Sequence, residues 1–115
     1  MSRRINQVNE LIQREVAEYF RRDIEFPRDC FVTVTRVETH PDLRNTKIFV
    51  SVLPFVKHAQ ALQMLTRARG RVQAMLNGKL FMHHVPHIQF ALDPTEEHAS
   101  AVESILDDLQ KKGEV

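Results

Sequence analysis

The sequence is short of cysteine and of long apolar segments. Its single cysteine, Cys30, cannot form an internal disulfide, as expected for a protein of a reducing compartment. No uninterrupted apolar run exceeds three residues, so we expect no membrane-spanning helix. The N-terminal residues also lack the apolar stretch of a secretory signal, so we expect no such signal. Hydrophobic residues make up 43% and charged residues 27% of the 115 residues, as in ordinary globular domains. We therefore expect one cytoplasmic domain over residues 1–115.

Acidic residues are missing from residues 57–79, although the net charge of the whole chain is only +1. This segment carries five basic residues, whereas residues 93–115 carry seven acids and two lysines. Such an asymmetry is typical of a protein that presents one face to a polyanion. A helix with a solvated cationic face would give the same pattern, so charge alone leaves both interpretations open.

Hydrophobic periodicity predicts a mixed α+β order. Apolar residues at three- and four-residue spacing indicate helices, and alternating β-branched runs indicate strands. The predicted elements are a helix over 3–22, strands over 32–37 and 47–52, a helix over 57–76, a strand over 85–92 and a helix over 94–112. Turn residues at 40–45 predict that the first two strands form an antiparallel pair. Three such strands need helices on one face to be stable, and we expect residues 1–93 to form this core.

Gly70 lies inside the predicted helix over 57–76, among three arginines. Glycine costs about 1 kcal/mol there relative to alanine, so we expect a kink or break at Gly70 and a helix end at Asn77-Gly78. In a straight helix Arg69 lies about 200° from Arg67, whereas a break would allow all three arginines to face one ligand. The N–H groups of a second helical segment would also favour an anion. The structural alternative is a glycine that packs against another helix.

Three histidines, His83, His84 and His87, suggest a metal site. No cysteine pair or His-Glu-x-x-His motif accompanies them, and in an extended chain His84 points away from the other two. We therefore expect no metal or cofactor here, and histidines that contact RNA or solvent. Cys30 precedes an apolar strand, which favours a small core residue over a nucleophile. No phosphate-binding glycine motif of nucleotide enzymes is present, so we expect neither an enzyme nor a small-molecule substrate.

Several local motifs together resemble a known family. In order they are Arg3-Arg4-Ile5, Phe26-Pro27-Arg28, Val34-Thr35-Arg36-Val37-Glu38, Pro41-Asp42-Leu43, Lys47-Ile48-Phe49-Val50-Ser51, Ala68-Arg69-Gly70, and Val85-Pro86-His87-Ile88-Gln89-Phe90 with Asp93. Each is a weak signal alone. Their joint order and spacing, from about Arg3 to Leu109, resemble ribosome-binding factor A, a family of small bacterial ribosome-assembly proteins.

The resemblance implies a type II KH-like domain of the α+β class, with a kinked central helix, a three-stranded sheet with helices on one face, and an added C-terminal helix. It further implies binding to the free or immature 30S subunit and support of late 16S rRNA maturation near the 5′ end of that RNA, without catalysis. In this family an Ala-x-Gly kink, matched here by Ala68-Arg69-Gly70, replaces the Gly-x-x-Gly loop with which ordinary KH domains clamp the nucleic-acid backbone.

The residues that we expect to bind RNA surround the kink and the start of the first helix. They are Arg3, Arg4, Arg67, Ala68, Arg69, Gly70, Arg71 and Lys79. Among the departures from the family pattern, Gln73 stands where arginine is frequent, and His87 where glutamate is frequent. We expect a monomer with no membrane partner.

Three alternatives to an assembly factor stay open. A generic KH-like module for single-stranded RNA would prefer a sequence in free RNA. A small protein–protein interaction domain would keep its binding in high salt. A metal-dependent enzyme would need His83, His84 and His87 to converge.

Overall fold

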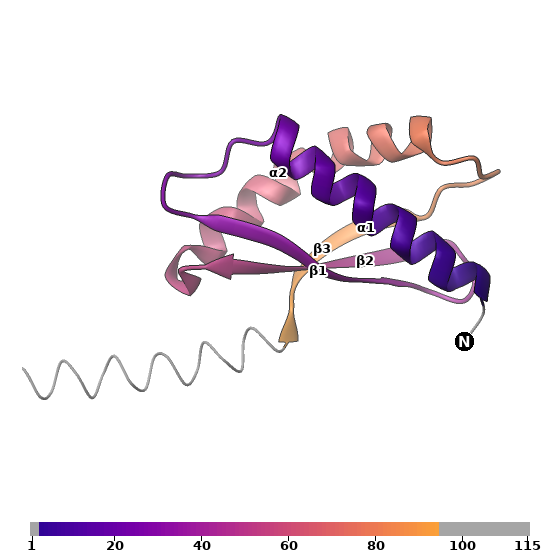
Figure 1. Cartoon of the computed structure of the whole chain (residues 1–115), viewed down its shortest axis with the longest axis horizontal. Helices are drawn as coiled ribbons and strands as arrows, with labels where there is room; N and C mark the ends of the chain where they lie inside the picture. The colour runs from indigo at the N-terminus through magenta and orange to yellow at the C-terminus, as the bar shows by residue number, and fades with distance from the viewer. Residues whose placement is uncertain (1–2, 95–115) are drawn as a thin grey trace, which may run out of the picture.

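The computed structural model describes residues 3–94 (Figure 1). Its elements are α1 (Arg3–Asp23), β1 (Phe31–Thr39), β2 (Asn45–Leu53), a short 3-10 helix η1 (Phe55–Lys57), α2 (His58–Lys79) and β3 (His87–Leu92). Each helix and strand predicted within these residues is present, with boundaries shifted by a few residues. Apart from Pro94, the helix predicted over 94–112 lies outside the described residues. No helix within residues 3–94 is long and apolar enough to cross a membrane.

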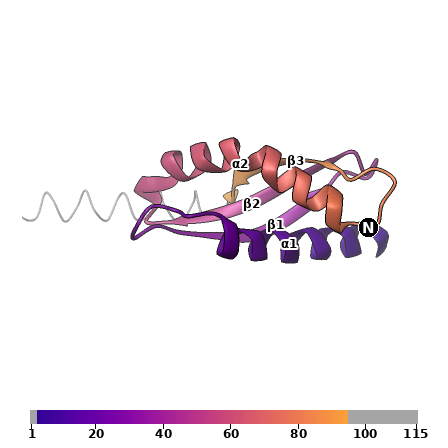
Figure 2. The same cartoon turned by 90° about the horizontal axis from the view of Figure 1, so that it is seen from above.

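The three strands form one sheet in the order β1-β2-β3. β1 and β2 are antiparallel, as predicted, and β3 lies parallel to β2. A parallel neighbour requires a crossover connection, and α2 provides it. Both helices lie on the same face of the sheet (Figures 1 and 2), which confirms the predicted layering.

The core lies between the two helices and the covered face of the sheet. Each helix contributes one stripe of buried side chains at three- and four-residue spacing, and the strands contribute mainly β-branched residues. The stripe of α1 is Ile5, Val8, Ile12, Val16 and Phe20, and that of α2 is Ala61, Leu65, Ala68, Val72 and Leu76. The strands add Val34, Val37, Ile48, Val50 and Ile88 to the core. Full burial of such a large apolar side chain contributes about 1.5–3 kcal/mol, so this core holds both helices to the sheet.

A β-bulge interrupts β1, where the pairing with β2 shifts between Val34 and Arg36. Sequence alternation alone does not predict this extra residue. Because of it, buried positions change from even to odd numbers, with Val34 before the bulge and Val37 and Thr39 after it. Thr39 is thereby turned inward, towards α1.

Thr39 fixes the start of α1 against the hairpin of β1 and β2. Its hydroxyl Oγ1 donates to Oδ1 of Asn9 at 2.6 Å and lies 2.9 Å from Oγ1 of Thr46. The N-terminal half of α1 is therefore held against the hairpin at Asn9.

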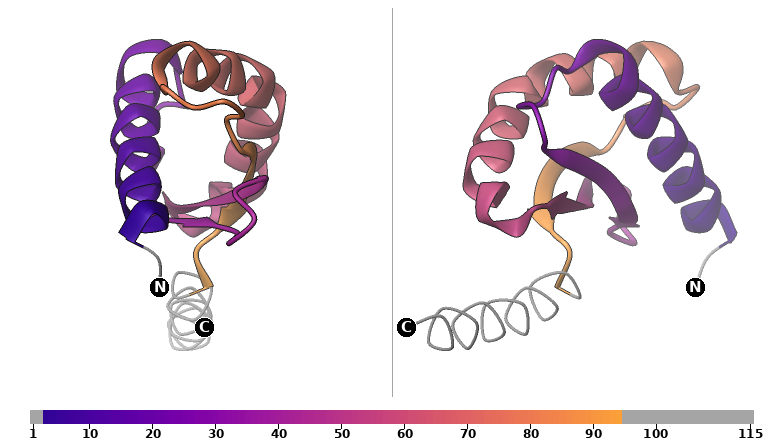
Figure 3. Two further views of the ribbon diagram at one scale, coloured as in Figure 1. Left: turned by 90° about the vertical axis from the view of Figure 1, so that its right-hand side faces the viewer. Right: turned by 60° about the vertical axis from the view of Figure 1, so that its left-hand side comes forward.

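Helix α2 is bent but unbroken. It is α-helical without interruption from His58 to Lys79, and Gly70 has a negative φ. Figures 2 and 3 show its axis changing direction near the middle of the helix, as the predicted kink requires. The buried stripe continues through Ala68 and Val72, so core packing holds the helix together across Gly70 and no second helical start forms.

The end predicted for α2 at Asn77-Gly78 is wrong by one or two residues. The helix passes through Gly78 to Lys79 because the N–H of buried Leu80 still donates to the carbonyl of Leu76 at 2.9 Å. Tertiary burial of Leu80 therefore outweighs the local preference of glycine to end a helix.

Candidate nucleic-acid interface

Gly70 lies on the outward side of α2, between two flanks that carry the arginines. Ala68 is almost fully buried, whereas Gly70 is exposed. With about 100° per residue, Arg69 falls on one side of Gly70, and Arg67 and Arg71 fall together on the other. The expected convergence of all three arginines on one face does not occur, because it required a break in the helix. The cations instead border an exposed glycine on both sides.

The space next to Gly70 is open. Apart from its chain neighbours and the nearby backbone of its own helix, a Cβ built on Gly70 would meet no heavy atom of the described residues within 4 Å. Nothing in this part of the chain therefore requires glycine at this place, which argues against a helix-packing role. An open glycine on the outside of a helix allows an external group to approach the backbone closely.

Arg67 and Arg71 are exposed cations on the same side of α2. Within residues 3–94 neither forms an ion pair or a hydrogen bond with another side chain. Cations without carboxylate partners can neutralise phosphates without first breaking an ion pair.

Arg69 differs, because it contacts the first residue of β3. Its Nη1 lies 3.1 Å from Nε2 of His87. Arginine can only donate, so Nε2 of His87 accepts and the ring carries its hydrogen on Nδ1. The backbone N–H of His87 in turn donates to the carbonyl of Arg44 at 2.9 Å. Arg69 is thus linked through His87 to the turn between β1 and β2, a link that sequence analysis did not find.

Gln73 holds the start of β3 against α2. Its Nε2 donates to the carbonyl of Pro86 at 3.0 Å and to Oδ1 of Asn77 at 3.1 Å, and its Oε1 accepts from the N–H of Ile88 at 2.9 Å. An arginine at this position has no acceptor for the N–H of Ile88. Glutamine, a departure from the family pattern, therefore has a positioning role here.

Lys79, another predicted RNA-binding residue, has an internal carboxylate partner. Its Nζ lies 3.9 Å from Oε2 of Glu15 on α1. The two residues predicted on α1 lie in its first turn, far along the helix from Glu15. Arg3 is exposed there. Arg4 lines a cleft at the hairpin end of the molecule, that is, the end with the turn between β1 and β2.

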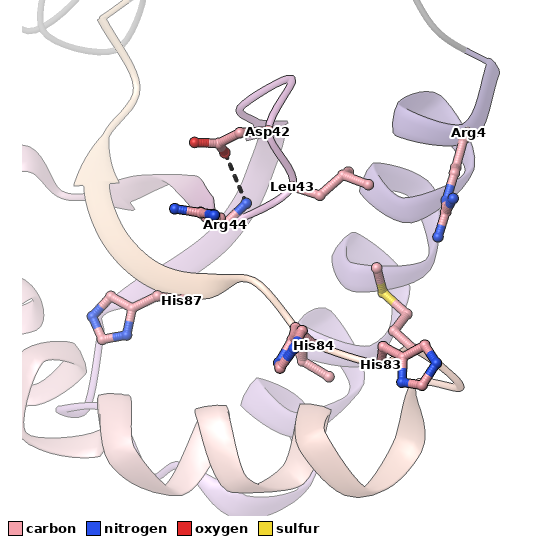
Figure 4. Close-up of a pocket in the computed structure, with 9 residues that line it drawn as sticks. Arg4, Asp42, Leu43, Arg44, His83, His84 and His87 are labelled. Carbon is pink, nitrogen blue, oxygen red and sulfur yellow. Dashed lines mark hydrogen bonds between the residues drawn. The ribbon is translucent and has the colours of Figure 1, made fainter.

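This cleft has a volume of about 550 Å³ and is shared by three parts of the chain (Figure 4). Its lining consists of Arg4 from α1, Asp42, Leu43 and Arg44 from the turn between β1 and β2, and Met82, His83, His84, Val85 and His87 from the segment that leads into β3 and the first residue of that strand. Two arginines and three histidines thus surround the cleft, together with one carboxylate among the described residues. The sequence alone predicts Arg44 only as a turn residue.

The Asp42 carboxylate stabilises the turn at the edge of the cleft. Its Oδ1 accepts from the N–H of Arg44 at 2.8 Å and lies 3.0 Å from Nδ1 of His40. The hydrogen bond from the Arg44 backbone, supported by His40, lowers the pKa of Asp42 below its ordinary value. This carboxylate therefore remains ionised at neutral pH and is occupied in holding the turn.

Two other sequence hypotheses can be placed in the structure. Among residues 3–94, no group of three histidine, cysteine or acidic side chains could hold a metal ion. Cys30 is buried in a small apolar cluster with Val52 and Ala61, which confirms it as a core residue.

Comparison with known proteins decides the family. Residues 4–106 match the family model described as ribosome-binding factor A. The chain belongs to the ribosome-binding factor A family. Family members from Desulforamulus reducens (35% identity over 113 residues, 97% of this chain and 94% of the relative) and Brevibacillus brevis (36% over 112 residues, 96% and 93%) align along nearly their whole lengths.

Solved structures of ribosome-binding factor A share the fold. The crystal structure from Thermus thermophilus superposes with a TM-score of 0.68 at 25% identity, covering 76% of this chain and 93% of that one. The solution structure of a putative member from Thermotoga maritima gives 0.67 at 28% identity, covering 79% and 88%. A Thermus thermophilus homology model fitted into a cryo-EM map of a complex of the 30S subunit with ribosome-binding factor A gives 0.60 at 26%, covering 72% and 88%. The KH-like fold is thereby confirmed.

Proposed function

We propose that this chain binds the free or immature 30S ribosomal subunit through its 16S rRNA and supports late maturation of that RNA near its 5′ end. The observation that carries the proposal is membership of the ribosome-binding factor A family over residues 4–106. The Thermus thermophilus relative in a complex with the 30S subunit supports the choice of partner.

The proposed RNA-binding surface comprises Arg3, Arg4, Arg67, Ala68, Arg69, Gly70, Arg71 and Lys79. The sugar–phosphate backbone crosses α2 at Gly70, where no Cβ keeps it away, and the arginines on both sides neutralise its phosphates. Ala68 does not contact the RNA directly; its buried side chain packs in the core and holds in place the helix that carries these cations. Lys79 contributes less than the arginines because Glu15 already offsets its charge.

The chain acts by occupancy, as a cytoplasmic monomer without catalytic activity. Support for the absence of catalysis comes from its relatives, which are named as binding factors, and from the position of Cys30 inside an apolar cluster. Differential affinity for immature and mature subunits then determines when the protein binds and leaves.

Co-sedimentation with free 30S subunits, free 50S subunits and joined ribosomes at two salt concentrations tests the proposal. We expect the protein to migrate with free 30S subunits only, and less of it at the higher salt concentration. Equal migration with all three particles, or 30S binding that does not respond to salt, would contradict the proposal. A generic module for single-stranded RNA would instead prefer a short oligonucleotide to the subunit.

A further inference from the structure

We propose that the cleft at the hairpin end is a second RNA-contacting site, which holds a single-stranded segment of RNA next to the segment bound at α2. Its phosphates lie among Arg4, Arg44 and the histidines, and one of its bases stacks on Phe81. This inference rests on the proposed function, because it assumes that the partner is RNA.

Charge favours a phosphate-bearing ligand in the cleft. Arg4, Arg44, His83, His84 and His87 line it from three parts of the chain, and all five are exposed. Asp42, the one acidic residue among the described lining residues, is bonded to the backbone of the turn. Figure 4 shows that the labelled side chains come from α1, from the hairpin turn, from the segment before β3 and from the first residue of β3. Two arginine charges, together with imidazole rings that can hydrogen-bond to phosphate, around an open space suit a polyanion.

Phe81 offers an exposed aromatic ring on which an unpaired base can stack, and this favours single-stranded RNA over a duplex. Its ring is fully exposed, and it follows buried Leu80 directly at the end of α2. Phe81, Met82 and Arg4 also line a neighbouring pocket of about 270 Å³, so Arg4 lies at the border between the aromatic ring and the cleft. Exposed aromatic rings next to cationic grooves bind single strands by stacking, and every base offers a face for this contact.

The cleft adjoins the α2 surface, by which we mean Gly70 and the arginines Arg67, Arg69 and Arg71. His87 lines the cleft and lies 3.1 Å from Arg69. One strand can therefore pass from Gly70 over Arg69 and His87 towards Arg44 and Arg4. Gln73 keeps this path in place, because it fixes the backbone on both sides of His87.

The test uses the whole chain and two probes, purified 30S subunits and a single-stranded uridine decamer. The cleft variants are Arg44→Gln and Phe81→Ala. Their matched controls, Arg28→Gln and Phe31→Ala, change the same residue types at the other end of β1, where Phe31 is the first residue of the strand and Arg28 lies three residues before it. Arg69→Gln reports separately on the surface at α2. Thermal melting of every variant verifies folding.

We expect Phe81→Ala to weaken 30S binding about tenfold without changing its salt dependence, as for the loss of one stacked base. Arg44→Gln should lower the slope of log K against log salt by about 0.7, as for the loss of one single-strand phosphate contact. Arg28→Gln and Phe31→Ala should bind 30S subunits like the unmodified chain. In NMR titration with the decamer, amide signals of residues 42–44 and 81–87 should move, and those of residues 28–31 should not. A matched RNA duplex should cause smaller changes.

Other outcomes separate failure of this inference from failure of the proposed function. If Arg69→Gln weakens 30S binding while Arg44→Gln and Phe81→Ala match their controls, the function stands and the second site is wrong. If 30S subunits do not bind but the decamer moves the cleft signals, the proposed function fails and the single-strand site stands. If neither probe binds, or the duplex binds the cleft as tightly as the decamer, the inference is overturned.

Discussion

The two helices cover the same face of the sheet, but their basic side chains have different surroundings. In the last turns of α1, Arg21 lies 2.5 Å from a carboxylate oxygen of Glu18, and Arg22 lies 3.5 Å from Asp23. The hydrogen bond and charge of Arg21 lower the pKa of Glu18 below its ordinary value. In the middle of α2, Arg67 and Arg71 have no such partner within residues 3–94.

This difference shows that a count of cations is a poor guide to a binding surface. Paired and unpaired arginines are both solvated, and an exposed ion pair contributes at most about 1 kcal/mol to stability. A paired arginine, however, must give up its carboxylate before it can neutralise a phosphate. The absence of acids from residues 57–79 therefore matters because no carboxylate of the same helix competes for Arg67 and Arg71.

The largest expected effect comes from removing two unpaired charges from α2. The double variant Arg67→Gln/Arg71→Gln should bind 30S subunits about 10- to 100-fold more weakly at low salt, since two phosphate contacts are lost. The matched variant Arg21→Gln/Arg22→Gln removes two paired charges from α1 and should stay within about twofold. Equilibrium binding to labelled 30S subunits measures both. Equal losses in the two variants would mean that net charge, not placement, determines affinity.

Removing the link between α2 and β3 should cost stability. Gln73→Ala leaves the N–H of Ile88 and the carbonyl of Pro86 without their partner, which should lower the free energy of unfolding by about 1–2 kcal/mol. The exposed Gln63 of the same helix is the control, because alanine there should change stability by less than about 0.5 kcal/mol. Urea denaturation measures both. A Gln73→Ala variant as stable as Gln63→Ala would show that the bonds of Gln73 to β3 add nothing to the fold.

Alanine substitutions at the two glycines of α2, Gly70 and Gly78, distinguish an effect on helix stability from an effect on the approach of RNA to the helix. Apart from its chain neighbours and the nearby helix backbone, a Cβ at Gly70 or Gly78 would meet no atom of the described residues within 4 Å, so alanine at either position should stabilise the protein by about 0.5–1 kcal/mol. Only Gly70→Ala should weaken 30S binding, by severalfold, because only Gly70 lies between the arginines. If Gly70→Ala destabilises the protein, the bend of α2 itself needs glycine. If both variants bind normally, the RNA does not approach the helix at Gly70.

The smallest effect is expected at Lys79. Its pair with Glu15 spans 3.9 Å between partly exposed side chains, so Lys79→Gln should change stability by less than about 0.5 kcal/mol. The same variant should bind 30S subunits within about twofold of the unmodified chain. A loss as large as that of Arg69→Gln would place Lys79 fully in the interface.

The order of elements could be predicted because it follows from local patterns. Apolar spacing of three and four residues predicts the stripes of α1 and α2, and alternation predicts the strands. The bulge in β1 could not be predicted in the same way. In the sequence, the bulge is visible only as a change of the apolar positions from Val32 and Val34 to Val37. This change can be assigned to a bulge only when the pairing of β1 with β2 is known.

The candidate site was predictable in composition but not in arrangement. The basic residues and the lack of acids in residues 57–79 indicated α2 as the candidate site. The helix is unbroken because the core packs against it on both sides of Gly70, and local helix propensity does not include this packing. The contacts of Arg69 with His87 and of Gln73 with Ile88 join positions 15 or more residues apart. Arg44 looked like a turn residue because only the folded hairpin brings it to the same cleft as Arg4.

The salt dependence of 30S binding tests most directly whether the unpaired arginines of α2 contact phosphates. The slope of log K against log salt should be lower in magnitude by about 1.4–1.8 for Arg67→Gln/Arg71→Gln than for the unmodified chain, at about 0.7–0.9 for each phosphate contact. Equal slopes for the two proteins would contradict this account, even if the variant bound more weakly.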